Sequence, residues 1–490
     1  MPVILAVAPL LLVVALLASG RVGALVAGAA GLVATVFVVL VAPPADVALA
    51  PLMLRHAGVG AWLAWQVIAI VIGGIFFYRC VRARELADPR SAAPQAPAAL
   101  PGDLHRRLYF VCFLLGPFAE AVTGFGVGYI IALAMIARLG VRGMPALVLG
   151  LYSQCLVPWG ALAIGTTLGA QIVGMPPTVL GERCAVLQMP MHAAYLALFW
   201  HFLRATGVRL ALMRCLGDIA WTAVTISVVW LAHDVIDVEI AGAAPLGALV
   251  ALRWMRDERP DAATLARATR AALPYAALTL ALVLTRTVPL LQRELKALGA
   301  WQPFAGQLPF APFYAPGFWL LLAGAMTLAA AGASPVAVLR QAAASAWRPS
   351  VVTLLFVVMA AFYVGAGLAA SIANALHDAA GAAAALASPA FAAIGGFLTG
   401  SGAASNAMLM PMQAALAAEA HLDPSWAAAV QNGVTANLTM LSPIRVSMGA
   451  AILAVAGGDG VVYRVAWPLA LPPILTGIGA IGLLLVAPSG

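Results

Sequence analysis

Charged side chains are scarce in this sequence. Only 9% of the 490 residues are Asp, Glu, Lys or Arg, whereas 63% are hydrophobic. Soluble domains contain about 25% charged residues. Lysine is almost absent, since Lys296 is the only one, and the net charge of +8 therefore comes from arginine. This composition excludes an ordinary water-soluble fold and indicates a polytopic membrane protein.

Motifs for metal binding and catalysis are also missing. The five cysteines show no CxxC spacing, so neither a metal site nor a disulfide framework is predicted. No HExxH, GxSxG, Walker A or dinucleotide-binding pattern occurs in a usable context, which argues against an enzyme or an ATP-driven pump, and no cofactor is expected. The arginines lie between apolar runs, where they determine topology and do not form a nucleic-acid surface. The first run, 2–18, lacks a basic segment before it and is expected to be a retained span.

The apolar runs are long enough to cross a bilayer many times. A crossing helix needs about 20 apolar residues. We expect about 12 transmembrane helices on that rule, near 2–19, 22–42, 60–78, 144–179, 186–203, 216–236, 239–252, 271–291, 316–337, 350–371, 425–455 and 465–487. Two of these are predicted to be broken helices: 144–179 is interrupted by Pro158, Gly160 and Gly165, and 425–455 by Gly433, Asn437 and Ser442-Pro443. The arginine-rich segment 79–107 is placed in the cytoplasm.

Two further runs, 108–137 and 389–414, are predicted to be re-entrant hairpins. The first has 30 residues, fewer than the roughly 40 that two crossings need, and arginines flank both of its ends. It should therefore turn at 123–126 and return to the cytoplasm. The second is flanked by Asp378 and Glu419 without any arginine, so both of its ends should lie outside.

The two hairpins carry the same glycine motif. Thr123-Gly124-x-Gly126 recurs 276 residues later as Thr399-Gly400-x-Gly402. A hairpin, a broken span and a plain span follow one another in both halves, with opposite flanking charges. This order is typical of an inverted-repeat secondary transporter, whose substrate lies between the uncoiled segments. We expect four regions: N-terminal helices and the basic loop (1–107), a first repeat core (108–236), connecting scaffold helices (237–388) and a second repeat core (389–490).

Glu120 lies inside the first hairpin, just before its glycine turn. A buried carboxylate is costly unless it is protonated or paired, and such residues mark ion or proton pathways. Burial favours the neutral form, so we expect Glu120 to load and release a coupling proton. The alternative is a structural role, with the carboxylate hydrogen-bonded to free amides of the hairpin.

The polar and glycine residues of the hairpins and broken spans are the predicted substrate site. Glycines let backbone amides approach a ligand, a helix N-terminus attracts a carboxylate, and a guanidinium can grip one at two places. The candidates are Thr123, Gly124, Phe125, Gly126, Thr166, Thr399, Gly400, Ser401, Ser405, Asn406, Asn437, Ser442 and Arg445. Small residues could instead serve close helix packing, and Arg445 could hold helix-end carbonyls or pair with Glu120.

At these positions the chain resembles the lactate permease family of bacterial carriers. The matching blocks are Glu120-Ala-Val-Thr-Gly124-Phe125-Gly126, Phe397-Leu-Thr-Gly-Ser401 followed by Ala404-Ser405-Asn406-Ala407, and Gly433-Val434-Thr435 followed by Leu441-Ser442-Pro443. The resemblance implies proton-coupled uptake of lactate, glycolate or a similar 2-hydroxy monocarboxylate across the inner membrane. It also implies an ion-transporter-type fold with paired hairpins.

The chain departs from the family pattern in three places. Gly402 stands where the family has an acidic residue, no lysine occupies the region of Asn437 and Thr439, and Val127-Gly128 replaces a small residue and proline. Such losses of charge would alter the substrate or the coupling. A sodium-coupled carboxylate carrier is therefore the alternative to proton symport, and a channel or membrane enzyme is a more distant one. The sequence does not decide between a monomer and a homo-oligomer.

Overall fold

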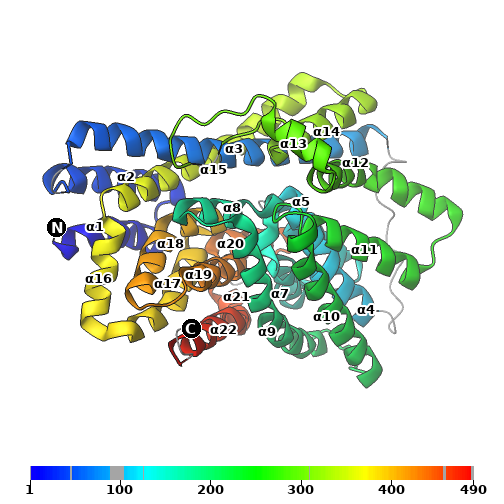
Figure 1. Cartoon of the computed structure of the whole chain (residues 1–490). Coiled ribbons are helices and arrows are strands. Elements are labelled where there is room, and N and C mark those ends of the chain that lie inside the picture. The colour runs from blue at the N-terminus through cyan, green and yellow to red at the C-terminus, as the bar shows by residue number, and fades with distance from the viewer. Residues whose placement is uncertain are drawn as a thin grey trace.

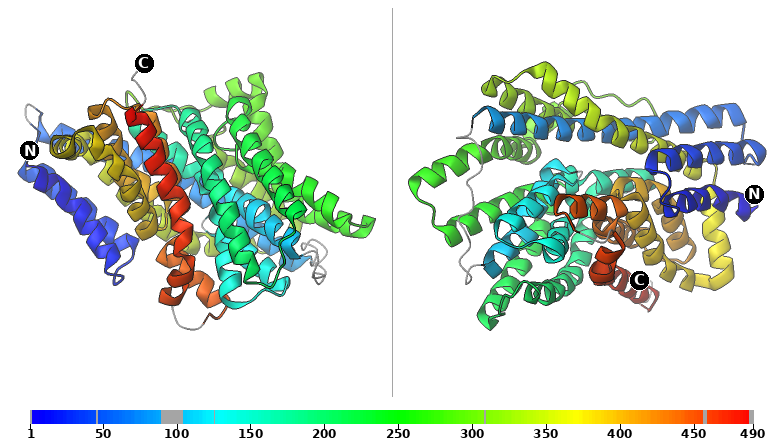
Figure 2. Two further views of the ribbon diagram at one scale, coloured as in Figure 1. Left: turned by 90° about the horizontal axis from the view of Figure 1, so that it is seen from below. Right: turned by 180° about the vertical axis from the view of Figure 1, so that it is seen from behind.

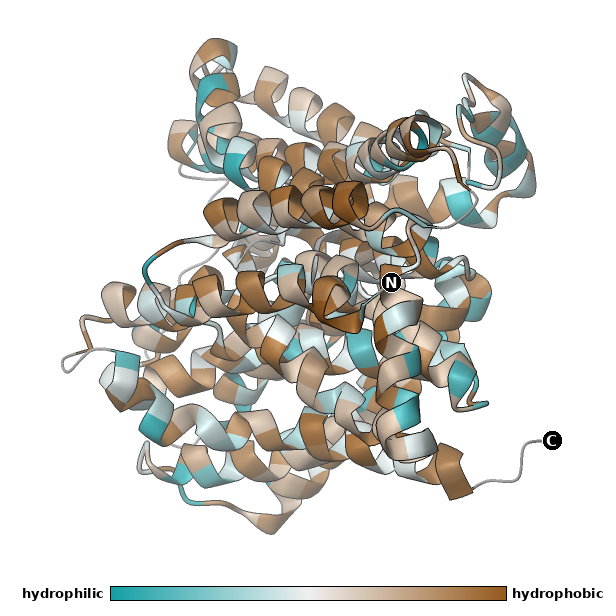
Figure 3. Cartoon of the chain, turned by 90° about the vertical axis from the view of Figure 1, so that its left-hand side faces the viewer, coloured by the Kyte–Doolittle hydropathy of each residue, from teal (hydrophilic) through white to brown (hydrophobic). Residues whose placement is uncertain are grey.

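The computed structural model describes residues 2–44, 47–88, 104–124, 126–307, 309–455 and 459–486. Within these ranges the regular structure is helical, apart from one isolated bridge between Trp301 and Phe310. The predicted all-helical class is confirmed. A helix pairs its backbone polar groups within its own segment, which a lipid environment requires. Hydrophobic residues cover most of the helices (Figure 3).

Seven helical stretches among the described residues are long and apolar enough to span a membrane. They are α2 (Ala24–Val41), α3 (Leu49–Ala87), α10 (Leu212–Val235), α12 (Ala262–Thr287), α15 (Pro335–Gly365), Leu368–Thr399 and Asp459–Val486. Shorter apolar helices include α1 (Val3–Ala18) and α14 (Pro316–Ala331). With 39 residues, α3 is about twice as long as its predicted span 60–78, because the helix continues through Arg55 and His56 at one end and through the arginine-rich segment at the other.

The helices form two layers (Figure 1). One layer consists of α3 with α14 and α15 packed along it, and α12 beside α14. The other is a larger group that contains both predicted hairpins. It also includes α9 (Pro177–Arg204), α11 (Ala243–Glu258) and α22 (Leu471–Val486). One hydrophobic cluster lies within the larger group. A second fills the contact region of α3 and α15 and continues to Leu168 on α8 (Gly160–Val173) and Met408 on α18 (Gly402–Glu419), so the two layers share an apolar contact.

The first predicted hairpin is a helix–turn–helix. Its first arm runs through α4 (Leu104–Tyr109), a π-helical segment (Phe110–Leu115) and α5 (Gly116–Thr123), and its second arm is α6 (Val127–Arg138). The arms pack closely, because a Cβ at Gly128 would lie 2.6 Å from the Glu120 backbone nitrogen. Glycine at 128 therefore permits the close approach.

The first predicted broken span is interrupted before its glycines. It consists of α7 (Gly143–Leu151), two 3₁₀ turns (Tyr152–Gln154 and Val157–Trp159) and α8 (Gly160–Val173). The break therefore includes Pro158, whereas Gly165 lies inside α8, contrary to its predicted role as an interruption. Glycine weakens a helix by only about 1 kcal/mol, and packing of α8 against α18 outweighs this.

The second half repeats the order of elements. The hairpin is α17 (Ser388–Thr399) and α18 (Gly402–Glu419), and the broken span is α19 (Pro424–Leu438), a 3₁₀ turn (Thr439–Leu441) and α20 (Pro443–Ile452). Ser442 accepts a hydrogen bond from the Arg445 backbone N–H, and Pro443 occupies the first helical position. A serine cap followed by proline is a strong helix start, which explains why the chain restarts its helix there. The remaining α-helices are α13 (Pro289–Ala297), α16 (Leu368–Ala380) and α21 (Asp459–Ala466), and two further 3₁₀ helices are Gly381–Ala387 and Trp467–Ala470.

The two halves exchange contacts across the middle of the larger layer. The second part of the first broken span, α8, packs against α18, and the corresponding α20 packs against α6. The 3₁₀ turns Tyr152–Gln154 and Thr439–Leu441 also touch each other. Figure 2 shows the orange and red C-terminal segments lying against the cyan ones. Both helix breaks therefore meet at one place in the fold.

Candidate functional site

A buried ion pair lies where α20 reaches the first hairpin. Arg445 Nη2 is 3.4 Å from Glu120 Oε1, and the Glu120 and Arg445 side chains are 4% and 10% exposed. The same carboxylate accepts hydrogen bonds from the backbone N–H groups of Gly126 and Gly128, both at 3.0 Å. Glu120 therefore makes the hydrogen bonds to hairpin amides that its alternative, structural role requires. Arg445 pairs with the same carboxylate.

The glycine turns of the two hairpins differ in conformation. In the first, Gly124 and Gly126 both have positive φ, of 63° and 82°. In the second, only Gly400 does, with φ of 61°, while Gly402 begins the helix. Phe125 lies outside the described residues. Only in the first turn do two backbone amides, those of Gly126 and Gly128 at the start of α6, donate to one carboxylate.

A network of uncharged polar side chains connects the second hairpin to both broken spans. The Asn406 amide on α18 donates to Asn432 Oδ1 on α19 at 2.8 Å and to the Gly165 carbonyl on α8 at 3.0 Å. Asn432 in turn donates to Thr166 Oγ1 at 2.8 Å. All three side chains are buried. The network therefore joins α8, α18 and α19, and two of its members, Thr166 and Asn406, are predicted site residues.

The other predicted residues divide between the turns and the helix ends. Thr123 and Thr399 each donate to the carbonyl four residues earlier, at Ala119 and Gly395. Ser401 accepts from the Ala404 N–H at 3.3 Å, and Ser405 shares a hydrogen bond of 2.9 Å with Thr435. The Asn437 amide donates to its own helix at Gly433, and its buried Oδ1 has no partner within the described residues. Asn437 therefore stands apart from the ion pair and from the network.

The family model of L-lactate permease matches residues 2–310 and 299–487 of this chain. The chain belongs to the L-lactate permease family. The predicted resemblance is thus confirmed across nearly the whole length, and this family member is a multi-pass helical membrane transporter. A comparison with curated proteins finds no match.

Two buried glutamines of this lactate permease family member were not among the predicted site residues. Gln431 on α19 donates to Thr435 Oγ1 at 2.9 Å, and Gln413 on α18 donates to Gln431 Oε1. Both glutamine side chains are fully buried. A signal was available for Gln431, because a polar residue four positions before Thr435 lies on the same helix face.

Removing the central amide of the network should destabilise the permease. Asn432→Ala deletes the hydrogen bonds to Asn406 and Thr166 and leaves buried polar groups under-satisfied. We expect the free energy of unfolding to fall by about 1–3 kcal/mol, measured by denaturant titration in detergent. Thr287→Ala is the matched control, since exposed Thr287 bonds only a carbonyl of its own helix. Equal stability of the two variants would contradict a structural role for the network.

Proposed function

We propose that the protein is a proton symporter for a small 2-hydroxy monocarboxylate, such as lactate or glycolate, in a bacterial inner membrane. Membership of the L-lactate permease family supports the substrate class. The observation that carries the coupling is the buried Glu120–Arg445 pair at the turn of the first hairpin. Sodium coupling is the alternative, because carbonyl and hydroxyl oxygens of the same region could bind a cation.

The pair offers a simple way to couple a proton to an anion. When Glu120 is ionised it occupies the Arg445 guanidinium and the amides of Gly126 and Gly128. A proton on Glu120 removes its charge, so the guanidinium becomes free for the substrate carboxylate. Each bound anion then accompanies one proton, and the buried charge stays balanced. Without the proton, the substrate and Glu120 would compete for one cation, and the loss of a buried counter-charge is costly.

We further infer that the two hairpins are re-entrant from opposite faces and that the halves form an inverted repeat. Ion pairs between residues assigned to the same side support this arrangement. Arg107 and Glu258 pair at 2.8 Å on the proposed cytoplasmic side, and Arg183 and Asp423 at 3.0 Å on the proposed external side. Alternating access would then come from movement of the larger layer against the α3–α14–α15 layer.

The Arg183–Asp423 pair should persist at moderately acidic pH. Burial raises the pKa of Asp423, but hydrogen bonds from Ser425 and the charge of Arg183 outweigh it, so that this pKa lies below its usual value. A lowered carboxyl pKa means that the stabilisation is present at neutral pH and is lost only as the pH falls through the lowered pKa.

Labelling from each side of the membrane tests the arrangement. Single-cysteine tags beside Arg138 and beside Glu419 should react with an impermeant thiol reagent from opposite compartments. The native cysteines interfere little, since four of the five are buried. If both tags react from the same compartment, the inverted arrangement is wrong.

Uptake into proteoliposomes tests the function. Wild-type protein should accumulate lactate or glycolate when the outside is made more acidic than the inside. Glu120→Gln should lose this pH drive while retaining substrate exchange at equal pH, because the neutral amide leaves Arg445 available without a titrating group. Glu294→Gln, at an exposed ion pair with Arg293, is the control. Uptake driven by a sodium gradient at fixed pH would instead favour the sodium-coupled carrier.

A further inference from the structure

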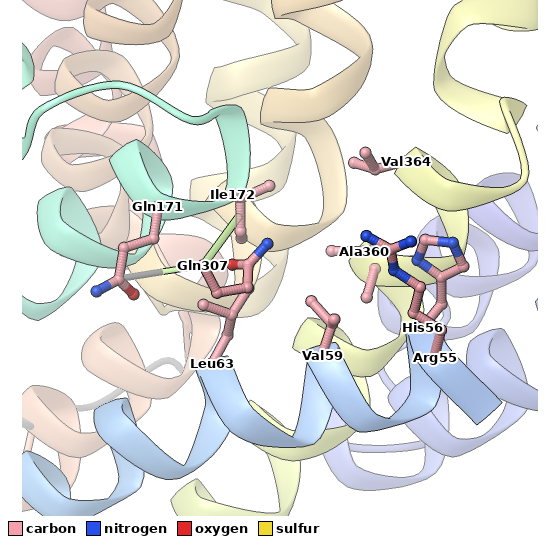
Figure 4. A pocket seen from close by; sticks show the side chains of 10 residues that line it. Arg55, His56, Val59, Leu63, Gln171, Ile172, Gln307, Ala360 and Val364 are labelled. Carbon is pink, nitrogen blue, oxygen red and sulfur yellow. The ribbon is translucent and has the colours of Figure 1, made fainter. Parts of the chain in front are cut away.

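A cavity of about 110 Å³ lies between the two layers, away from the Glu120–Arg445 pair. Its walls come from α3, α8, α15 and the loop 299–315 (Figure 4). Four polar side chains line it, Arg55 and His56 from α3, Gln171 from α8 and Gln307 from the loop, and no acidic residue does. Such a space holds several waters or one small organic anion.

The cavity combines a cationic end with an apolar wall. Arg55 forms no ion pair with any described residue, so its guanidinium is available to a ligand. Gln171 donates to Gln66 Oε1 at 3.5 Å, whereas its own buried Oε1 has no partner within the described part of the chain. Val59, Leu63 and Val364 supply apolar surface. The guanidinium suits a carboxylate, the two amides suit a further hydrogen-bonding group, and the apolar wall suits a short alkyl chain.

Packing holds the polar residues in place. A Cβ at Gly365 would overlap the His56 ring, so this glycine makes room for the imidazole at the cavity. The loop that carries Gln307 is fixed on α3 by aromatic contacts: the ring centroids of Trp62 and Trp301 are 5.0 Å apart, and Phe304 covers Gly58. The cavity is therefore a built feature of the fold.

The position of the cavity connects it to the transport region. Gln171 follows Thr166 on α8 by five residues, or about 8 Å along the helix, and Thr166 belongs to the buried polar network. The start of α3, opposite its arginine-rich C-terminal end, lies on the external side in the proposed topology. We propose that this cavity is an external staging site, at which the carboxylate substrate binds before it reaches the buried ion pair. This inference rests on the proposed function for its direction.

Two kinetic constants test the staging role in oriented proteoliposomes. Arg55→Ala should raise the half-saturating concentration for external lactate by about tenfold or more, the loss expected for a charge-assisted hydrogen bond. The maximal rate of this uptake should stay unchanged. Arg55→Lys keeps the positive charge and should retain part of the affinity for external lactate. Gly365→Ala should shift His56 and weaken the binding of external lactate without altering the charge of the cavity. Arg293→Ala, at an exposed external arginine, is the matched control.

A second measurement does not require transport. Val364→Cys, in a Cys215→Ser background, places a thiol at the cavity wall for an impermeant maleimide. Lactate at ten times its Kd should slow the alkylation roughly tenfold by simple occupancy, and Arg55→Ala should remove this protection. Absence of protection in a protein that transports lactate would overturn the staging site. Protection without proton-driven uptake would leave the site in place and fault the proposed symport instead.

Discussion

Replacing Arg445 with alanine should abolish proton-driven uptake and destabilise the protein. The change leaves the Glu120 carboxylate buried with only two backbone amides as partners. Breaking a buried ion pair costs about 3–5 kcal/mol, a factor of roughly 100 or more in an equilibrium constant. The measurements are lactate uptake in proteoliposomes and thermal unfolding in detergent, with Arg293→Ala as the control for loss of an exposed arginine.

The double variant Glu120→Gln with Arg445→Ala separates folding from transport. Because it removes both charges, we expect it to recover much of the stability that Arg445→Ala loses, while uptake stays absent. A double-mutant cycle of unfolding free energies should then give a large coupling energy between Glu120 and Arg445. Normal transport by Arg445→Ala would contradict a role of the pair in transport, and additive changes in stability would show that the two side chains are not coupled.

Alanine at Gly126 should reduce transport far more than alanine at Gly402, the matching position of the second hairpin. Gly126 has φ of 82°, a conformation that costs an L-residue about 1–2 kcal/mol, and a Cβ there would overlap the Arg445 guanidinium. Gly402 is helical and has nothing within 4 Å of an added Cβ. We expect at least a tenfold loss of uptake for Gly126→Ala and wild-type uptake for Gly402→Ala.

Uptake assays on both glycine variants at equal membrane abundance check this contrast. The repeated sequence motif alone treats the two positions as equivalent, so equal losses would show that the difference between the turns has no functional meaning. Reversed effects would place the substrate at the second hairpin.

Much of the helical organisation could be predicted, because hydropathy indicates the helical spans and glycine and proline positions indicate their interruptions. The turn between α5 and α6, the restart at Ser442-Pro443 and the all-helical class follow from local rules of backbone pairing and capping. The length of α3 could not be predicted from hydropathy. Its first turns carry Arg55 and His56 within a continuous helix, and tertiary packing against α15 maintains the helix there.

The candidate site could be predicted only in part. Glu120 and Arg445 stand out because charge is rare in apolar segments, but their pairing depends on the crossing of α20 over α6, which no local pattern encodes. Gln413 and Gln431 were missed because neutral amides in an Ala-rich helix look unremarkable until two helices face each other. The repeated TGxG motif likewise does not reveal that Gly126 has positive φ whereas Gly402 is helical, since glycine adopts either conformation at little cost.

The first arm of the first hairpin contains a π-helical segment, Phe110–Leu115, whereas its second arm, α6, is α-helical. Each π-type hydrogen bond spans one residue more than an α-type bond. If this segment adopted α-helical hydrogen bonding, the register of the helix would shift by one residue, and α5 would rotate by about 100° about its axis. Glu120 would then turn away from Gly126 and Arg445 without any bending of the membrane helices around it. A change of hydrogen-bond pattern in this one short segment would therefore change the partners of the buried carboxylate.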